Sequence, residues 1–161
     1  MSLMVKQSAF KNFDRSEVFD DEGNVRWYIK RERIALGYNI NVYNLENNKV
    51  ASILQRVTSF NPRFDITVDG KKFATINKVT TMFKPKYEIE GVTWQLDGDF
   101  YMHNFKVYSQ FGGLVMSQHK QWFTWGDTFI IDYSKQSDEL YCLCVALALD
   151  AADANSYRFI H

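Results

Sequence analysis

The chain has 161 residues, of which 46% are hydrophobic and 24% are charged, and its formal net charge is zero. This length suits one domain with a sizeable core, and the hydrophobic content excludes a disordered chain. A pI near 6.8 and the lack of a recognition motif lead us to expect no nucleic-acid partner. Residues 1–10 contain Lys6 and no sustained apolar run, so we expect a cytoplasmic protein without a secretory signal.

Up to residue 133 the sequence has the pattern of short strands joined by turns. Hydrophobic and polar residues alternate, which is typical of a sheet with one face in a core and the other in water. We count about a dozen such runs, the clearest at 25–30, 64–69, 73–78 and 105–108. Residues that favour tight turns separate the runs, at 20–24, 46–48, 69–70, 97–98 and 111–113.

After Lys135 the pattern predicts a helix. Ser137 is the expected N-cap, followed by two acidic residues in the first turn. The run Leu140–Leu149 has no polar stripe apart from the Tyr141 hydroxyl, so the helix must be buried on all sides. As a helix this run is roughly 15 Å long, half of what a bilayer core needs, and we expect no transmembrane segment. Residues 156–160 could add a last strand.

Several stretches resemble the LURP-one-related proteins of plants and bacteria. They are the segments 83–91, 94, 98–100 and 122–129, and the apolar helix leading to 148–150. The domain of that family is similar to the tubby C-terminal domain and to phospholipid scramblases. The resemblance covers nearly the whole chain. It implies a mainly β fold, a closed antiparallel β-barrel of about twelve strands wrapped around a central hydrophobic helix at about 138–151, in one domain spanning 1–161.

On function the resemblance implies less. Tubby-type domains bind phosphoinositides through basic side chains, and scramblase relatives are associated with phospholipid membranes. The phosphoinositide-binding residues of tubby domains have no assigned counterparts in this sequence. The acidic calcium-binding segment and the cysteine-rich palmitoylated stretch of scramblases have no evident counterparts either.

The chain carries no recognisable catalytic motif, so we expect neither an enzyme nor a cofactor. His103 and His119 each lie in a strand-like segment with no nucleophile at a fixed spacing, and a structural role is favoured. Residues 97–99 offer too few oxygens for calcium and favour a hairpin turn. Cys142 and Cys144 are expected to be small buried residues rather than a metal or redox pair.

Charge is unevenly distributed along the chain. Residues 49–86 hold eight basic and two acidic side chains, whereas residues 87–161 hold four basic and ten acidic ones. Since sequence neighbours are spatial neighbours in a meandering barrel, we expect the basic segment to form one side of it. Aromatic clusters at 100–102 and 122–125 suit either loop tips at a membrane interface or core packing, which is favoured.

We therefore hypothesise a binding module for anionic phospholipid, peripheral at the membrane. Its candidate contact residues are Lys71, Lys72, Lys84 and Lys86. One alternative is a protein-interaction scaffold with no lipid ligand. Another is that these lysines only solvate the outer faces of strands.

Overall fold

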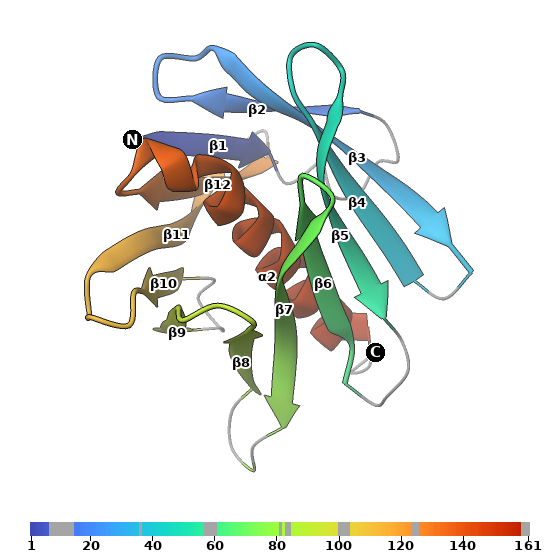
Figure 1. Cartoon of the computed structure of the whole chain (residues 1–161), viewed down its shortest axis with the longest axis vertical. Coiled ribbons are helices and arrows are strands. Elements are labelled where there is room, and N and C mark those ends of the chain that lie inside the picture. The colour runs from blue at the N-terminus through green and yellow to red at the C-terminus, as the bar shows by residue number, and fades with distance from the viewer. Residues whose placement is uncertain are drawn as a thin grey trace.

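The computed structural model of the chain describes residues 1–6, 15–35, 37–56, 61–80, 82, 85–99, 104–123 and 126–158. Within these residues, strands come first and helical elements last (Figure 1). The strands are β1 (Ser2–Lys6), β2 (Ser16–Asp20), β3 (Val25–Ile34), β4 (Gly37–Tyr43), β5 (Lys49–Arg56), β6 (Arg63–Val68), β7 (Lys71–Thr80), β8 (Pro85–Glu90), β9 (Gln95–Asp99), β10 (Asn104–Tyr108), β11 (Leu114–Phe123) and β12 (Gly126–Tyr133). A short 3-10 helix, η1 (Gln136–Asp138), leads into α2 (Glu139–Arg158).

All twelve strands belong to one antiparallel sheet that curls around α2. Neighbours in sequence are mostly neighbours in the sheet, and β1 pairs with β12, with Leu3 opposite Ile131. The strand order begins with β8 and ends with β9, and no ladder joins these two strands in the described part of the chain. The predicted β-barrel around a central helix is thus confirmed, but the barrel is nearly closed rather than closed.

Aromatic side chains fill the core beside the β8–β9 seam. The Phe73 ring lies with its centroid 5.4 Å from that of Trp94, in an edge-on contact, and 4.7 Å from that of Tyr141 on α2. Further along β8, Tyr87 is only 1% exposed. Because these large side chains exclude water there, the core stays covered without a continuous hydrogen-bond ladder.

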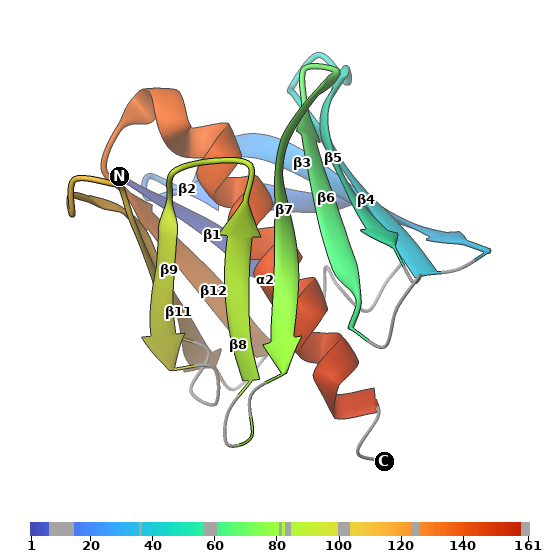
Figure 2. The same cartoon turned by 60° about the horizontal axis from the view of Figure 1, so that its bottom comes forward.

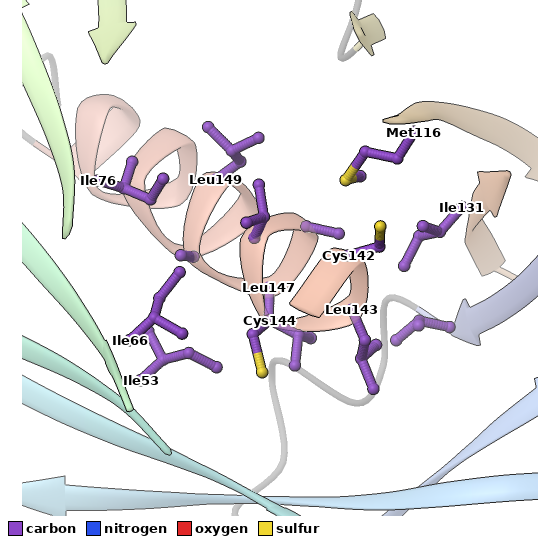
Figure 3. Close-up of a cluster of buried hydrophobic side chains, with 14 of the residues drawn as sticks. Ile53, Ile66, Ile76, Met116, Ile131, Cys142, Leu143, Cys144, Leu147 and Leu149 are labelled. Atoms are coloured by element: carbon purple, nitrogen blue, oxygen red, sulfur yellow. The ribbon is translucent and has the colours of Figure 1, made fainter. Parts of the chain in front are cut away.

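The axis of the barrel is occupied by α2. Its residues from Cys142 to Leu149 are each at most 3% exposed. Figure 3 shows Ile53, Ile66 and Ile76 on one side of the helix and Met116 and Ile131 on the other. The prediction of a helix buried on all sides is confirmed for this stretch, whereas Leu140 and Tyr141 are only partly buried.

The ends of the helix differ from those expected. Ser137 lies inside η1, whose N-cap position is Lys135, and no side chain caps it. The helix continues to Arg158, so the predicted strand at 156–160 is wrong for 156–158, and 159–160 lie outside the described residues. The segment 148–154 contains four alanines, the best helix former, which explains why the helix runs on past the apolar stretch.

Most of the predicted turns are confirmed. Asp69 and Gly70 join β6 to β7 with φ angles of 49° and 75°. The turn expected at residues 97–98 is wrong, because both residues lie within β9. Gly98 is needed there for another reason: a Cβ at this position would lie 2.3 Å from the carbonyl oxygen of Asn104 on β10. The connection between β8 and β9 instead falls at residues 91–94.

Candidate anion-binding surface

The two ends of the barrel differ in charge. Because consecutive strands are antiparallel, each strand end belongs either to the helix-entry end, where α2 begins, or to the helix-exit end, where α2 finishes (Figure 2). At the helix-entry end, acidic residues outnumber basic ones. The acidic residues are Asp20, Asp21, Glu22, Glu46, Asp69, Glu90, Asp132, Asp138 and Glu139, and the basic ones are Arg26, Lys49, Lys71, Lys72 and Lys135.

At the helix-exit end the balance is reversed. The described basic residues there are Lys6, Arg15, Arg31, Arg33, Arg56, Arg63, Lys78, Lys86, Lys120 and Arg158, and the acidic ones are Glu17, Glu32, Asp65, Glu88, Asp99, Asp127, Asp150 and Asp153. This polarity matches the helix dipole, whose partial positive charge lies at the helix-entry end and whose partial negative charge lies at the helix-exit end. The charge separation therefore also runs along the barrel axis.

Within the helix-exit end, one row of residues crosses the outer face of three strands. Arg56 on β5 is directly opposite Arg63 on β6, and Arg63 is opposite Asn77 on β7. Two like charges in directly opposed positions repel each other, which is unfavourable unless an anion lies nearby. The Asn77 side chain is 5% exposed, and neither its amide nitrogen nor its amide oxygen has a hydrogen-bond partner.

Asp65 neutralises one member of this row. The Arg56 guanidinium forms an ion pair with its carboxylate, and Thr75 Oγ1 donates a hydrogen bond of 2.7 Å to Oδ1. Partial burial raises the pKa of Asp65, but the Thr75 and Arg56 hydrogen bonds and the charges of Arg56 and Lys72 lower it by more, so the net pKa lies below the ordinary value. No carboxylate within ion-pair distance of Arg63 occurs among the described residues.

The structure separates the candidate lysines. Lys71 and Lys72 begin β7 at the helix-entry end, whereas Lys86 pairs with Val79 near the other end of that strand. Lys72 and Val79 are seven residues apart, which corresponds to roughly 23 Å along a strand. Lys84 lies outside the described residues. The strands that carry the basic segment, β5 to β8, are neighbours in the sheet and form one side of the barrel as expected, but the described lysines lie at both ends of that side.

Two of these lysines also have acidic neighbours. Lys72 Nζ lies 3.6 Å from Asp65 Oδ1, and Lys86 Nζ lies 3.8 Å from Glu88 Oε1. Both lysine side chains are mostly exposed, so solvent screens these ion pairs and each contributes little to stability. Lys71 is exposed and carries no ion pair within the described part of the chain.

A buried carboxylate, Glu139, joins the start of α2 to the barrel wall. It is 3% exposed and accepts hydrogen bonds from Tyr133 Oη at 2.5 Å, Gln136 Nε2 at 2.5 Å and Trp27 Nε1 at 2.7 Å. The Arg26 guanidinium adds contacts at 3.2 Å. These donors come from β3, β12 and η1, so a single side chain ties three elements to the helix.

The surroundings of Glu139 keep it ionised. Burial alone raises the pKa of Glu139. The hydrogen bonds from Tyr133, Gln136 and Trp27 and the charge of Arg26 lower it by more than burial raises it, so the net pKa lies below the ordinary value. Burial, followed by the hydrogen bond to Glu139 and its charge, raises the pKa of Tyr133. A carboxylate that accepts this many hydrogen bonds is suited to anchoring the helix and poorly suited to moving protons.

The histidines give no catalytic arrangement. His119 Nδ1 lies 3.8 Å from Asp132 Oδ2 on the outer face of β11 and β12, and both side chains are more than 40% exposed. The Ser2 hydroxyl donates to the same aspartate, not to the histidine. A nucleophilic triad needs the histidine between the other two groups, so this order does not fit one. His103 lies outside the described residues, as do residues 100–102 and 124–125 of the two aromatic clusters.

Both cysteines are buried and free. Burial raises the pKa of the Cys142 thiol to about 12. Since the thiolate is the reactive form, this thiol is inert at neutral pH. Elsewhere in the described residues, no group of three or more His, Cys, Asp or Glu side chains is placed to hold a metal ion.

The sequence reasoning missed the Arg56–Arg63–Asn77 row and the Glu139 cluster. Both arginines were visible as members of the basic segment, but only the register of β5, β6 and β7 places them opposite each other and next to Asn77. Glu139 was assigned to the first turn of the helix, where an acid is common. No sequence pattern indicates that residues 26, 27 and 133 converge on it.

Comparisons with known proteins agree with this fold. The family model described as LURP-one-related matches residues 1–150. An uncharacterised protein of Bacillus subtilis strain 168, YxjI, is 28% identical over 150 residues, which cover 93% of this chain and 92% of that protein. A crystal structure of an Arabidopsis thaliana protein superposes with a TM-score of 0.61 at 14% identity, covering 96% of this chain and 90% of that one.

These similarities fix the fold and the family. Among the described residues, no helix combines the length and the hydropathy that a bilayer crossing demands. The family match extends over most of the chain and includes every strand and the apolar half of α2. The chain belongs to the LURP-one-related family.

Proposed function

We propose that this protein is a non-enzymatic cytoplasmic module that docks its helix-exit end onto an anionic phospholipid surface. The observation that carries the proposal is the surplus of basic side chains at that end, within which Arg63 lies beside the unpartnered amide of Asn77. Each basic side chain near an anionic bilayer contributes about 1 kcal/mol of attraction. Because the net charge is zero, the attraction depends on which end faces the membrane.

The Arg56–Arg63–Asn77 row provides the chemistry that a phosphate-bearing headgroup needs. A guanidinium donates two parallel hydrogen bonds to phosphate oxygens. Arg63 is exposed, and Arg56 retains donors beyond those used by Asp65. A bound phosphate would also relieve the repulsion between the two guanidinium groups.

One fully exposed apolar side chain lies at the same end, and the turns at the helix-entry end expose Phe111 and Leu45 as well. Met82 lies between β7 and β8 and is 91% exposed. Fully exposed large hydrophobic side chains are unfavourable in water, and burial in the interface between headgroups and acyl chains removes that cost. Basic and apolar groups on one surface are the combination that peripheral membrane proteins use.

Co-sedimentation with vesicles tests the proposal. We expect the full chain to pellet with phosphatidylcholine vesicles that contain phosphatidylserine or a phosphoinositide, and to stay in the supernatant with phosphatidylcholine alone. The variant Arg63→Glu/Lys86→Glu should lose most binding. The matched variant Lys49→Glu/Lys71→Glu, with the same charge change at the helix-entry end, should keep it.

Two results would contradict the proposal. One is pelleting that does not depend on anionic lipid. The other is an equal loss of binding in both variants, because electrostatic attraction without a preferred end does not need the helix-exit surface. Raising the salt concentration should weaken the binding of the wild type to anionic vesicles, since salt screens the attraction between exposed charges.

A further inference from the structure

Asp65 is the carboxylate that the sheet places beside the Arg56–Arg63–Asn77 row. It follows Arg63 by two residues on β6, so both side chains extend from the same outer face of the sheet. The strand register puts it opposite Leu54, and therefore diagonal to Arg56 on β5. The Arg56 guanidinium donates to this carboxylate through Nη2 at 3.0 Å and also pairs with it through Nε. The charge of Arg56 is thereby offset within the chain.

The carboxylate is held from its other side as well. Thr75 Oγ1 donates to Oδ1 at 2.7 Å, and Lys72 Nζ lies 3.6 Å from the same oxygen. Because Thr75 is buried, moving the carboxylate away would leave a buried hydroxyl without its acceptor. Partial burial raises the pKa of Asp65, but the Thr75 and Arg56 hydrogen bonds and the neighbouring charges lower it by more, so the group is ionised at neutral pH. An anion that approaches Arg63 therefore meets a fixed negative charge.

This fixed charge affects small anions and anionic surfaces to different extents. It repels a phosphate group that lies beside the two guanidinium groups, whatever the source of that phosphate. An isolated phosphate contacts only this row and has no further attraction to offset the repulsion. A membrane surface is also attracted by Lys6, Lys86 and the other basic side chains of the helix-exit end. The carboxylate thus removes most of the affinity for a small anion and only part of the affinity for a surface.

We propose that Asp65 is a specificity-determining residue, a counter-anion within the chain that keeps isolated phosphate groups off the Arg56–Arg63 pair and reserves this pair for surfaces that present many anionic groups. This inference rests on the proposed function, because it concerns the same anion-binding row. The Arg56 side chain is 45% exposed, so solvent screens its ion pair with Asp65 and the pair contributes little to stability. Substitution of Asp65 should therefore change anion binding more than folding.

The first experiment titrates the full chain with inorganic phosphate at constant ionic strength and follows the side-chain Nε signals of Arg56 and Arg63 by NMR. In the wild type we expect weak shifts at Arg63 and little change at Arg56. Asp65→Asn keeps the shape of the side chain and an acceptor for Thr75, so both signals should shift and the affinity should rise about threefold to tenfold. Glu17→Gln makes the same charge change at an exposed position of β2 at the same end, and should bind phosphate as the wild type does.

Vesicles provide the second arm. At constant ionic strength, free phosphate should leave the wild type bound to phosphatidylcholine vesicles that contain phosphatidylserine, and should release a larger fraction of Asp65→Asn. Thermal unfolding checks that each variant folds, and Asp65→Ser, which also lacks the charge, takes the place of Asp65→Asn if that variant does not fold.

The outcomes separate this inference from the lipid proposal. If the wild type binds anionic vesicles but loss of the Asp65 carboxylate brings no gain in phosphate affinity, this inference alone fails. An equal gain in Glu17→Gln would also overturn it, because the effect would then come from net charge and not from the position of Asp65. If the wild type ignores anionic vesicles while Asp65→Asn gains phosphate affinity, the lipid proposal fails and the exclusion of isolated phosphate by Asp65 stands.

Discussion

The Tyr133 hydroxyl donates a hydrogen bond of 2.5 Å to the Glu139 carboxylate six residues further along the chain, where the last strand gives way to the helix. Trp27 Nε1 donates to the same carboxylate from β3, which lies three strands from β12 in the sheet. The buried helix is thereby fixed to the barrel wall by directional bonds as well as by apolar contacts.

Removing the Glu139 carboxylate should destabilise the fold strongly. In Glu139→Ala, Tyr133, Trp27 and Arg26 lose a shared acceptor in a buried site, and we expect a loss of about 2–4 kcal/mol in the free energy of unfolding. Tyr133→Phe removes one donor and should cost roughly 1–2 kcal/mol. Urea denaturation measures both values. Equal stability of Glu139→Ala and the wild type would show that this cluster does not anchor the helix.

The Glu139 carboxylate should also make the stability of the fold depend on pH. Its pKa in the folded protein lies below its ordinary value, so the unfolded state binds its proton at a higher pH than the folded state does. The stabilisation is complete above the unfolded pKa and is lost as the pH falls through the folded pKa. Comparing wild type with Glu139→Gln by urea denaturation between neutral and acidic pH tests this. The stability difference should shrink as the pH falls, and a difference independent of pH would contradict the prediction.

A cavity at the barrel axis should be costly. Leu147 is 1% exposed, and Leu147→Ala removes buried methyl groups from a site enclosed by the sheet, so we expect a loss of about 2–5 kcal/mol. Leu45, in the β4–β5 turn, is 56% exposed, and Leu45→Ala should change stability by no more than about 0.5 kcal/mol. Thermal or urea unfolding distinguishes them. Similar effects of the two substitutions would contradict the enclosed position of α2.

The substitution Gly98→Ala tests whether β9 and β10 approach each other closely at this position. A Cβ at this position would meet the carbonyl oxygen of Asn104 at 2.3 Å and Cα of Phe105 at 2.9 Å, so Gly98→Ala must push the strands apart. We expect a loss of roughly 1–3 kcal/mol. At Gly113 the nearest atom is the flexible Ser109 Oγ at 3.4 Å, and Gly113→Ala should have a small effect. If unfolding experiments find both substitutions neutral, β9 does not pack as described.

Alternation and turn residues predicted the sheet well, because both depend on local chemistry. The prolines also lie as strand starts require: Pro62 immediately precedes β6, and Pro85 is the first residue of β8. The residues of α2 from Cys142 to Leu149 are buried because no face of that segment is polar. The enclosed helix therefore followed from composition and periodicity alone.

Long-range geometry could not be obtained in this way. Asp97-Gly98 reads as a turn signal, but Gly98 is required by a backbone contact with β10 that no local pattern records. The open seam between β8 and β9 depends on how far the sheet curls, which sequence alternation does not determine. Likewise, the eight basic residues of 49–86 form one cluster in sequence, but the described ones lie at both ends of the neighbouring strands β5 to β8.

The position of α2 after all twelve strands has a consequence for biosynthesis. During translation the strands leave the ribosome with their apolar inner residues before the helix that fills their interior exists, and β1 must wait for β12, more than a hundred residues later. Contacts between residues so distant in sequence slow folding and prolong the exposure of incomplete sheets. The nascent chain should therefore depend on chaperones until its last helical turns have been synthesised.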